Sequence, residues 1–282
     1  MTIGGLFDAL CAELTERHEA VIVLEEAAGD RIAALFPRFG NEAPAPLVER
    51  AMGLAARRRR GEPLQHVLGH WSFRRLDLLQ DPRALIVRPE TEVVVEIALA
   101  ELSRSPAEGR LRRALDLGTG SGAIALSLVS EVEDLSVVAS DRSVPALELA
   151  AANRARLGEP ARARLSLLAA DWLGSIATTG PGFELIVANP PYLGEAEWEG
   201  LDAVVRDFDP KEALVAGATG LEALEQLLGA AASRLARSGS LVCEIGAGQA
   251  GAVRTLAQRA GYREVRIETD LVGRDRVLVV RL

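Results

Sequence analysis

The chain of 282 residues contains few cysteines and histidines and no long apolar run, and each absence excludes a class of protein. The two cysteines, Cys11 and Cys243, lie in apolar patterns, which excludes a disulfide framework. His18, His66 and His70 have neither metal-ligand spacing nor cysteine partners, so we expect no metal site. No apolar run reaches the roughly 18 residues of a membrane span, and no signal-peptide pattern opens the sequence. We therefore expect a cytoplasmic protein with no membrane partner.

Lysine is almost absent, because Lys211 is the only one among 32 basic residues. Arginine suits phosphate, which raises the question of nucleic-acid binding. The formal net charge is nevertheless −8, and it is evenly spread: residues 1–95 hold 12 basic and 14 acidic residues, and residues 96–282 hold 20 and 26. Neither part has the basic surface of a nucleic-acid-binding protein, so we expect no direct nucleic-acid partner. The arginine excess is typical of biased codon usage.

The first 60 residues show a helical pattern. Leu6, Leu10 and Leu14 recur at helical spacing, and further apolar residues follow in the same way. We expect residues 1–70 to form a small helical bundle. The basic run 57–60 closes a helical pattern just before a glycine and a proline, as a solvated C-terminal cap does, and contact with a partner is the alternative.

From about residue 95, apolar runs alternate with helical patterns, after a stretch at 71–94 that we expect to form a hairpin linker. This alternation predicts that residues 95–282 form an α/β domain with a largely parallel sheet covered on both faces. A helix is expected over 221–235. Ligands bind such sheets beyond the carboxyl ends of the strands, where the polar motifs described below fall. The expected strands are 114–117, 135–140, 165–170, 185–188, 241–245, 265–268 and 277–280.

A glycine-rich turn follows the first expected strand, and an acidic residue ends the second. The turn consists of Gly118, Thr119, Gly120, Ser121 and Gly122. Glycines at alternate positions let the backbone approach a ligand and turn into a helix, although a purely structural turn has the same pattern. Asp141 can accept two hydrogen bonds from a ribose diol, or it can cap the next helix. Together they predict an adenosine ligand, either NAD or S-adenosylmethionine.

The run Asn189-Pro190-Pro191-Tyr192 favours S-adenosylmethionine. Two prolines fix the backbone and remove two donors, which leaves rigid carbonyl acceptors beside the oxygen of the Asn189 side chain. Two acceptors suit an NH₂ group, and the Tyr192 ring can pack on a planar group and exclude water. A dehydrogenase has no use for this arrangement, whereas an N-methyltransferase does, because its catalysis depends mainly on positioning and electrostatics.

These motifs together resemble the release-factor glutamine N5-methyltransferases, a branch of the class I S-adenosylmethionine-dependent methyltransferases. The resemblance covers nearly the whole chain and is weakest in the first 50 residues. Its most specific part, at 88–92, marks this family among the Asn-Pro-Pro-Tyr enzymes. Val87 and Ser72 depart from the family pattern without touching the proposed chemistry. The other matching segments are Leu68-Gly69-x-Trp71-x-Phe73, the residues 116–125, Asp141, Asp171-Trp172, Glu244-Ile245-Gly246 and Gly273-Arg274-Asp275-Arg276.

The resemblance implies a seven-stranded class I methyltransferase sheet that uses S-adenosylmethionine and releases S-adenosylhomocysteine. In this family the residues matching 118–122 wrap the methionyl part, Asp141 holds the ribose, and Asp171 and Trp172 border the adenine. Asn189 is also expected among the cofactor-binding residues. The substrate is the glutamine of the Gly-Gly-Gln loop of peptide chain release factors, which the N-terminal bundle helps to grip. The residues implied to bind and orient this glutamine are Asn189, the carbonyl of Pro190, Pro191 and the ring of Tyr192.

Three alternatives remain at this point. An adenine N6 methyltransferase of nucleic acids uses the same turn, but it needs a basic cleft that the charge distribution does not provide. A ribosomal-protein glutamine methyltransferase is a closer relative, and the run at 88–92 argues against it. A non-catalytic cofactor-binding scaffold has no need of an intact Asn189-to-Tyr192 turn.

Overall fold

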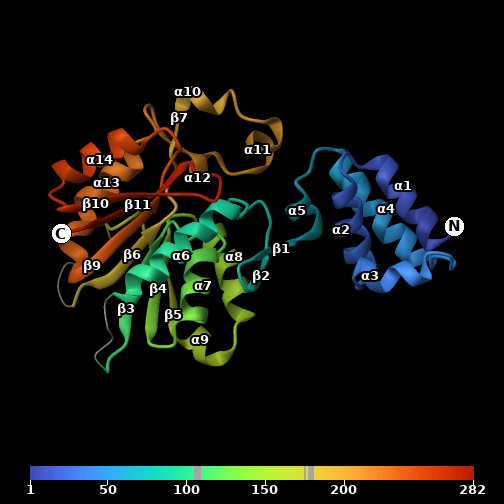
Figure 1. The fold of residues 1–282 in the computed structure, drawn as a ribbon, viewed down its shortest axis with the longest axis horizontal. Helices are drawn as coiled ribbons and strands as arrows, with labels where there is room; N and C mark the ends of the chain where they lie inside the picture. Colours follow the sequence, from blue (N-terminus) through green and yellow to red (C-terminus); the bar gives the residue numbers. More distant parts are fainter. Residues whose placement is uncertain (105–108, 175, 177–180) are drawn as a thin grey trace. The chain divides into compact units, whose positions relative to one another are not determined.

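The computed structural model describes residues 1–104, 109–174, 176 and 181–282, which form two compact units, Met1–His70 and Trp71–Leu282 (Figure 1). The first unit is helical, and Leu6 and Leu10 are fully buried in it, as their spacing predicts. None of the helices in the described ranges is long and apolar enough to cross a membrane. The elements of the first unit are α1 (Ile3–Glu13), α2 (Arg17–Ala28), α3 (Ile32–Leu35), η1 (Phe36–Arg38), α4 (Ala45–Arg59) and α5 (Leu64–Leu68).

The basic run at 57–60 bonds within this unit. The Arg57 guanidinium donates to the Glu62 carboxylate and to the carbonyl oxygens of residues 66 and 67, both at 2.9 Å. Arg58 Nε donates to Glu19 Oε1 at 2.9 Å, which ties the end of α4 to α2. The run therefore joins helices of the bundle and is more than the solvated cap that its sequence predicts.

A sheet of seven strands organises the second unit. Its strands lie in the order β10-β11-β9-β6-β3-β4-β5, and only β11 runs antiparallel to its neighbours. The predicted α/β fold with a seven-stranded, mostly parallel sheet is thus confirmed. The strands are β3 (Arg112–Leu117), β4 (Leu135–Asp141), β5 (Leu165–Ala169), β6 (Phe183–Ala188), β9 (Leu235–Glu244), β10 (Glu264–Thr269) and β11 (Asp275–Arg281).

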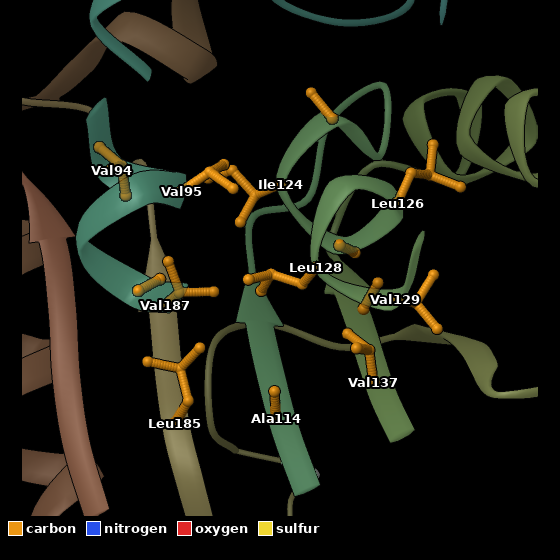
Figure 2. Packing of buried hydrophobic residues seen from close by; sticks show 14 of the residues in the cluster. Val94, Val95, Ala114, Ile124, Leu126, Leu128, Val129, Val137, Leu185 and Val187 are labelled. Carbon is orange, nitrogen blue, oxygen red and sulfur yellow. The ribbon is translucent and has the colours of Figure 1, made fainter. Parts of the chain in front are cut away.

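Helices cover both faces of this sheet, and the central strands are buried on both sides. In β6, Leu185 and Val187 join one apolar cluster, whereas Ile186 and Ala188 join the other, as the two-residue period of a strand requires. Figure 2 shows the first cluster, in which side chains of α6 and α7 pack toward β3, β4 and β6. The helices of this side are α6 (Pro89–Ser103), α7 (Ala123–Glu131), α8 (Val144–Ala155) and α9 (Glu159–Ala163); α13 (Glu222–Ala231) and α14 (Ala250–Arg259) pack on the other side.

Some boundaries differ from those expected. The hairpin of β1 (His70–Phe73) and β2 (Leu76–Leu79) is short, and α6 begins at Pro89, inside the stretch expected to be linker. Proline at the first helical position and acidic residues in the first turn favour a helix start there. The helix expected over 221–235 ends earlier, in η2 (Ala232–Arg234), because Leu235 already pairs with Phe183 in the sheet.

A small substructure follows β6 that the sequence reading does not anticipate. It contains β7 (Leu193–Gly194), α10 (Glu195–Trp198), α11 (Ala203–Phe208), α12 (Lys211–Leu214) and β8 (Val215–Gly217), and β7 pairs with β8.

The strand order fixes where a ligand binds. From β3 the chain adds strands on one side, β4 and then β5, and it later adds β6 and β9 on the other, so β3 and β6 flank the topological switch point. Leu117 lies opposite both Ser140 and Ala188. The segments that begin at Gly118 and Asn189 therefore leave the sheet from adjacent strands at the same level.

Candidate active site

A cavity of about 640 Å³ opens at this carboxyl edge of the sheet. Its walls come from segments that are far apart in sequence: 83–88 and Thr91, the turn after β3, the ends of β4 and β5, the turn after β6, and residues between 210 and 226. The cavity brings most of the predicted site residues together, while Gly122, Pro190 and Tyr192 do not line it. The predicted residues in its wall are Gly118, Thr119, Gly120, Ser121, Asp141, Asp171, Trp172, Asn189 and Pro191.

The turn after β3 requires its glycines. Gly120 has φ +56° and donates its backbone N–H to Asp141 Oδ2 at 2.9 Å. Gly122 has φ +88°, and a Cβ there would lie 2.9 Å from the Leu126 side chain. Both positions are left-handed, which glycine adopts without the steric cost that a side chain incurs. The turn therefore presents bare backbone to the cavity.

Asp141 supports this turn and does not cap a helix. Its second oxygen, Oδ1, accepts from Ser143 N at 2.9 Å, and the N-cap of α8 is Ser143, whose hydroxyl accepts from Ala146 N. Each carboxylate oxygen can accept more than one hydrogen bond. Asp141 thus retains acceptor capacity on the cavity side, and its role toward a ribose diol stays a prediction.

Beneath the turn lies a buried acid, Asp116, whose role is not predicted from the sequence. Asp116 Oδ2 accepts from the Thr119 hydroxyl at 2.6 Å and from Ala125 N at 3.2 Å. Burial raises the pKa of Asp116 to about 7, against the effect of these two bonds. The carboxyl joins the start of α7 to the glycine turn.

Trp172 serves both the core and the cavity. Its side chain is half-buried against the cluster that α13 and α14 cover, and its ring lies 3.7 Å from where a Cβ on Gly118 would be. Its φ of +48° is unusual for a bulky residue and places a left-handed turn in the backbone after β5. Asp171 beside it is exposed at the cavity wall. Their predicted place beside an adenine ring remains a prediction.

The side chain of Asn189 is the end of a short chain of hydrogen bonds that includes Thr91 and Glu244. Its Nδ2 donates to Thr91 Oγ1 at 3.1 Å, and the Thr91 hydroxyl donates to Glu244 Oε2 at 2.8 Å. The amide nitrogen of Asn189 thus donates within the protein, and the amide oxygen Oδ1 is the atom that can accept a hydrogen bond from a ligand. This is the acceptor that the sequence reading expects from Asn189.

The backbone of the following turn is clamped. Tyr192 N donates to Leu214 O at 3.2 Å, and its carbonyl accepts from Gln249 Nε2 at 2.8 Å. Gln249 also donates to Gly220 O at 3.1 Å and accepts from Gly246 N at 2.9 Å. Gly220 lies so close that a Cβ there would be 2.5 Å from Tyr192 O. One glutamine amide thus ties together the loops after β6, β8 and β9.

Two groups near this turn have raised pKa values. Burial raises the pKa of the Glu244 carboxyl to about 7, while its bond from Thr91 and the charge of Arg276 act in the opposite direction. Burial, with the charge of Glu244 as a smaller cause, raises the pKa of Tyr192 to about 12. The Tyr192 phenol is therefore neutral at physiological pH.

Arg88 anchors the cavity wall and does not pair with Glu92. Its Nη2 donates to the buried carboxylate of Asp209 at 2.6 Å, and the other oxygen of Asp209 accepts from Ile86 N at 3.2 Å. Glu92 Oε1 instead accepts from Arg74 N at 3.1 Å. Arg88 thus holds segment 86–88 to the loop before α12.

Several of these residues could not be assigned from sequence. Thr91 and Glu244 lie inside segments that resemble the family, yet nothing local indicates that they meet at Asn189. Gln249 and Asp209 carry no motif at all. No cluster of three metal-ligating side chains occurs among the residues that the structure describes.

The strand order and the positions of the motifs at the switch point define a class I methyltransferase. A family model, the methyltransferase small domain, matches residues 96–208. The solved methyltransferase from Pyrococcus furiosus has a TM-score of 0.50 and 17% identity over 74% of this chain and 90% of that one. The hMettl16 catalytic domain has a TM-score of 0.57 and 13% identity over 84% and 82% of the two chains. At these identities the structures show the fold alone.

Relatives with higher identity define the family. The release factor glutamine methyltransferase of Nitratidesulfovibrio vulgaris is 40% identical over 81% of this chain and 75% of its own. Those of Burkholderia pseudomallei and Escherichia coli are 38% and 37% identical, over 98% and 96% of this chain and 95% and 94% of their own. The chain belongs to the release factor glutamine methyltransferase family. The predicted family and the predicted enzyme class are thus confirmed.

Proposed function

We propose that this chain transfers a methyl group from S-adenosylmethionine to the side-chain amide nitrogen N5 of the glutamine in the Gly-Gly-Gln loop of a peptide chain release factor. The observation that carries the proposal is the orientation of Asn189 at the switch point. The amide nitrogen of Asn189 donates to Thr91 Oγ1, so the amide oxygen of Asn189 is the atom available to accept from a substrate NH₂ group. The names of the relatives support the same substrate.

The cavity residues fit S-adenosylmethionine. A Cβ on Gly118 would occupy space beside the Trp172 ring, so the bare turn leaves room for an extended ligand. In the proposal, residues 118–122 hold the methionyl part, Asp141 accepts from the ribose hydroxyls, and Asp171 with Trp172 borders the adenine. When bound, this group supplies a methyl on a sulfonium, and it leaves as S-adenosylhomocysteine.

The chain's own residues position the reacting nitrogen. Asn189 Oδ1 and the carbonyl oxygen of Pro190 accept the two amide protons, which favours localisation of the nitrogen lone pair. S-adenosylmethionine, held by residues 118–122 and Asp141, would supply the methyl group that this lone pair takes up. The product amide loses one proton to water, which requires no strong base. Tyr192 walls the planar amide and excludes other water.

We also propose that residues 1–70 form a unit that recognises the release factor, and that 71–94 link it to the catalytic unit at 95–282. Phe36, at the start of η1, has 71% of its surface exposed although it is large and apolar. Aromatic side chains are enriched in the contact surfaces between proteins, so Phe36 is the position at which we test contact with a partner. Phe36→Ser should therefore raise KM for an intact release factor and leave the rate on a short Gly-Gly-Gln peptide unchanged.

The substrate is tested by incubating the protein with methyl-labelled S-adenosylmethionine and purified release factors, and then mapping the methyl by mass spectrometry. We expect one methyl on the glutamine of the Gly-Gly-Gln loop and none on a release factor in which this glutamine is replaced by alanine. Parallel incubations contain duplex DNA, RNA and ribosomal proteins. Label on these alone, or no label on any release factor, would contradict the proposal.

A further inference from the structure

A chain of two hydrogen bonds ends at Asn189 and begins at a buried acid. Glu244 is the last residue of β9, Thr91 lies in the first turn of α6, and Asn189 follows β6. Glu244 and Thr91 are buried, with 1% and 5% of their surfaces exposed. The distances are 2.8 Å from the Thr91 hydroxyl to Glu244 Oε2 and 3.1 Å from Asn189 Nδ2 to Thr91 Oγ1.

The direction of these bonds follows from the number of protons available. An ionised carboxylate only accepts, so the single hydroxyl proton of Thr91 goes to Glu244. Thr91 Oγ1 is then an acceptor toward Asn189, which must present its NH₂ group there. A protonated Glu244 can itself donate to Thr91 Oγ1. The hydroxyl proton of Thr91 is then available to Asn189, whose oxygen can take the place of its nitrogen.

We propose that ionised Glu244, acting through the Thr91 hydroxyl, is a positioning residue that holds the amide oxygen of Asn189 toward the substrate NH₂ group. This inference rests on the proposed function. In the opposite orientation the NH₂ group of Asn189 faces the substrate NH₂ group, and one of the two acceptors is lost. Glu244 touches neither substrate nor cofactor in this scheme, and it is not among the residues that line the cavity.

The surroundings of Glu244 make its charge sensitive to pH. The charged and titratable groups around it are Arg276 on β11, Arg88 and Glu90 at the start of α6, and Tyr192 after β6. The two arginines stabilise the ionised form and Glu90 opposes it, but burial is the largest effect and raises the pKa of Glu244 to about 7. The ionised, productive form is therefore lost as pH falls through neutrality.

We call the two hydrogen bonds that link Glu244, Thr91 and Asn189 the relay, and three variants test it. Thr91→Val keeps the shape but removes the hydroxyl, and Glu244→Gln removes the charge. We expect each to lower kcat roughly tenfold and to abolish the rise of kcat with pH around 7, because a charge-assisted hydrogen bond no longer fixes the amide. Thr91→Ser retains the hydroxyl and should restore both the rate and the pH profile. The Kd for S-adenosylmethionine should stay within about twofold throughout.

Matched controls are available on exposed helix faces. Thr255→Val on α14 and Glu225→Gln on α13 make the same chemical changes outside the cavity, and both should keep the wild-type pH profile. Thermal unfolding shows which variants are folded. If Thr91→Val does not fold, Thr91→Ser and Glu244→Gln decide the matter.

A readout without activity separates this inference from the proposed function. NMR of the wild-type protein with labelled asparagine side chains should show the Asn189 amide signals titrating with the Glu244 carboxyl, and this coupling should vanish in Thr91→Val and Glu244→Gln. If the wild-type protein methylates no release factor, the proposed function is wrong. The NMR titration does not depend on that result and still tests the relay. The relay would be overturned if Glu244→Gln kept the wild-type kcat and pH profile. It would also be overturned if the Asn189 amide signals did not shift as Glu244 titrates.

Discussion

Replacing Asn189 by alanine removes one of the two acceptors proposed for the substrate amide. The side chain is half-buried at the cavity wall, and its Nδ2 donates a hydrogen bond to Thr91 Oγ1. The other proposed acceptor, the carbonyl of Pro190, is unchanged, because the alanine substitution leaves the following backbone intact. Asn189→Ala should therefore impair the transfer step specifically.

The magnitudes follow from these contacts. A hydrogen bond aimed at the reacting group contributes about 3 kcal/mol to the transition state, which is roughly 10²-fold in kcat. The lost bond to Thr91 costs about 1 kcal/mol of unfolding free energy. The turn that we propose to hold the cofactor follows β3, whereas Asn189 follows β6, so the Kd for S-adenosylmethionine should change by no more than about threefold.

The assay is single-turnover methyl transfer to a release factor at saturating cofactor, together with calorimetric measurement of cofactor affinity and urea unfolding. Asn41→Ala, in an exposed turn of the first unit, is the matched control and should retain the wild-type rate. Transfer by Asn189→Ala at a near-wild-type rate would refute the two-acceptor mechanism. A large loss of cofactor affinity would instead show that Asn189 acts through the cofactor.

Three further substitutions test the framework of the site. Gln249→Leu removes the clamp on the Tyr192 carbonyl and should lower kcat at least about tenfold in the same transfer assay, with cofactor affinity nearly unchanged. Gly122→Ala places a Cβ 2.9 Å from the Leu126 side chain at φ +88° and should lower the unfolding free energy by about 2 kcal/mol in urea. The carboxyl of Asp116 has a folded-state pKa of about 7 and an ordinary value of 3.8, so its contribution to stability is largest below about pH 4 and is lost as pH rises to about 7. Asp116→Asn should therefore lose less unfolding free energy than wild type between pH 5 and pH 8.

Two substitutions on α14 serve as controls for the glutamine and glycine variants. Gln258→Leu on α14 and Gly251→Ala, where a Cβ meets nothing within 4 Å, should leave activity and stability close to wild type. Wild-type kcat in Gln249→Leu would show that the turn needs no clamp. Equal pH slopes in Asp116→Asn and wild type would show that this carboxyl is ionised in the folded protein.

Much of the fold follows from local patterns that a sequence shows directly. The central strands are short apolar runs because both faces of β6 are covered, and the seven expected strands all occur. The glycines of the turn after β3 occupy left-handed positions, which few other residues accept. The motif at Asn189 is equally local, because two prolines fix their own backbone.

One boundary that differs, the end of α13, is not fixed by a local pattern. Leu235 fits a helix as well as a strand, and its pairing with Phe183 places it in the sheet. The start of α6 at Pro89, in contrast, has local signals, because a proline stands at the first helical position and acidic residues lie in the first turn.

By itself, the sequence determined which segments form the turn after β3, the acid after β4 and the Asn-Pro-Pro-Tyr turn after β6. Only the tertiary structure decided how these groups are oriented. Thr91 bonds to Asn189 across 98 positions and to Glu244 across 153, and Gln249 reaches Tyr192 across 57. A hydrogen bond between such distant residues leaves no periodic or local trace in the sequence, because it exists only once the order of the strands has brought their ends together.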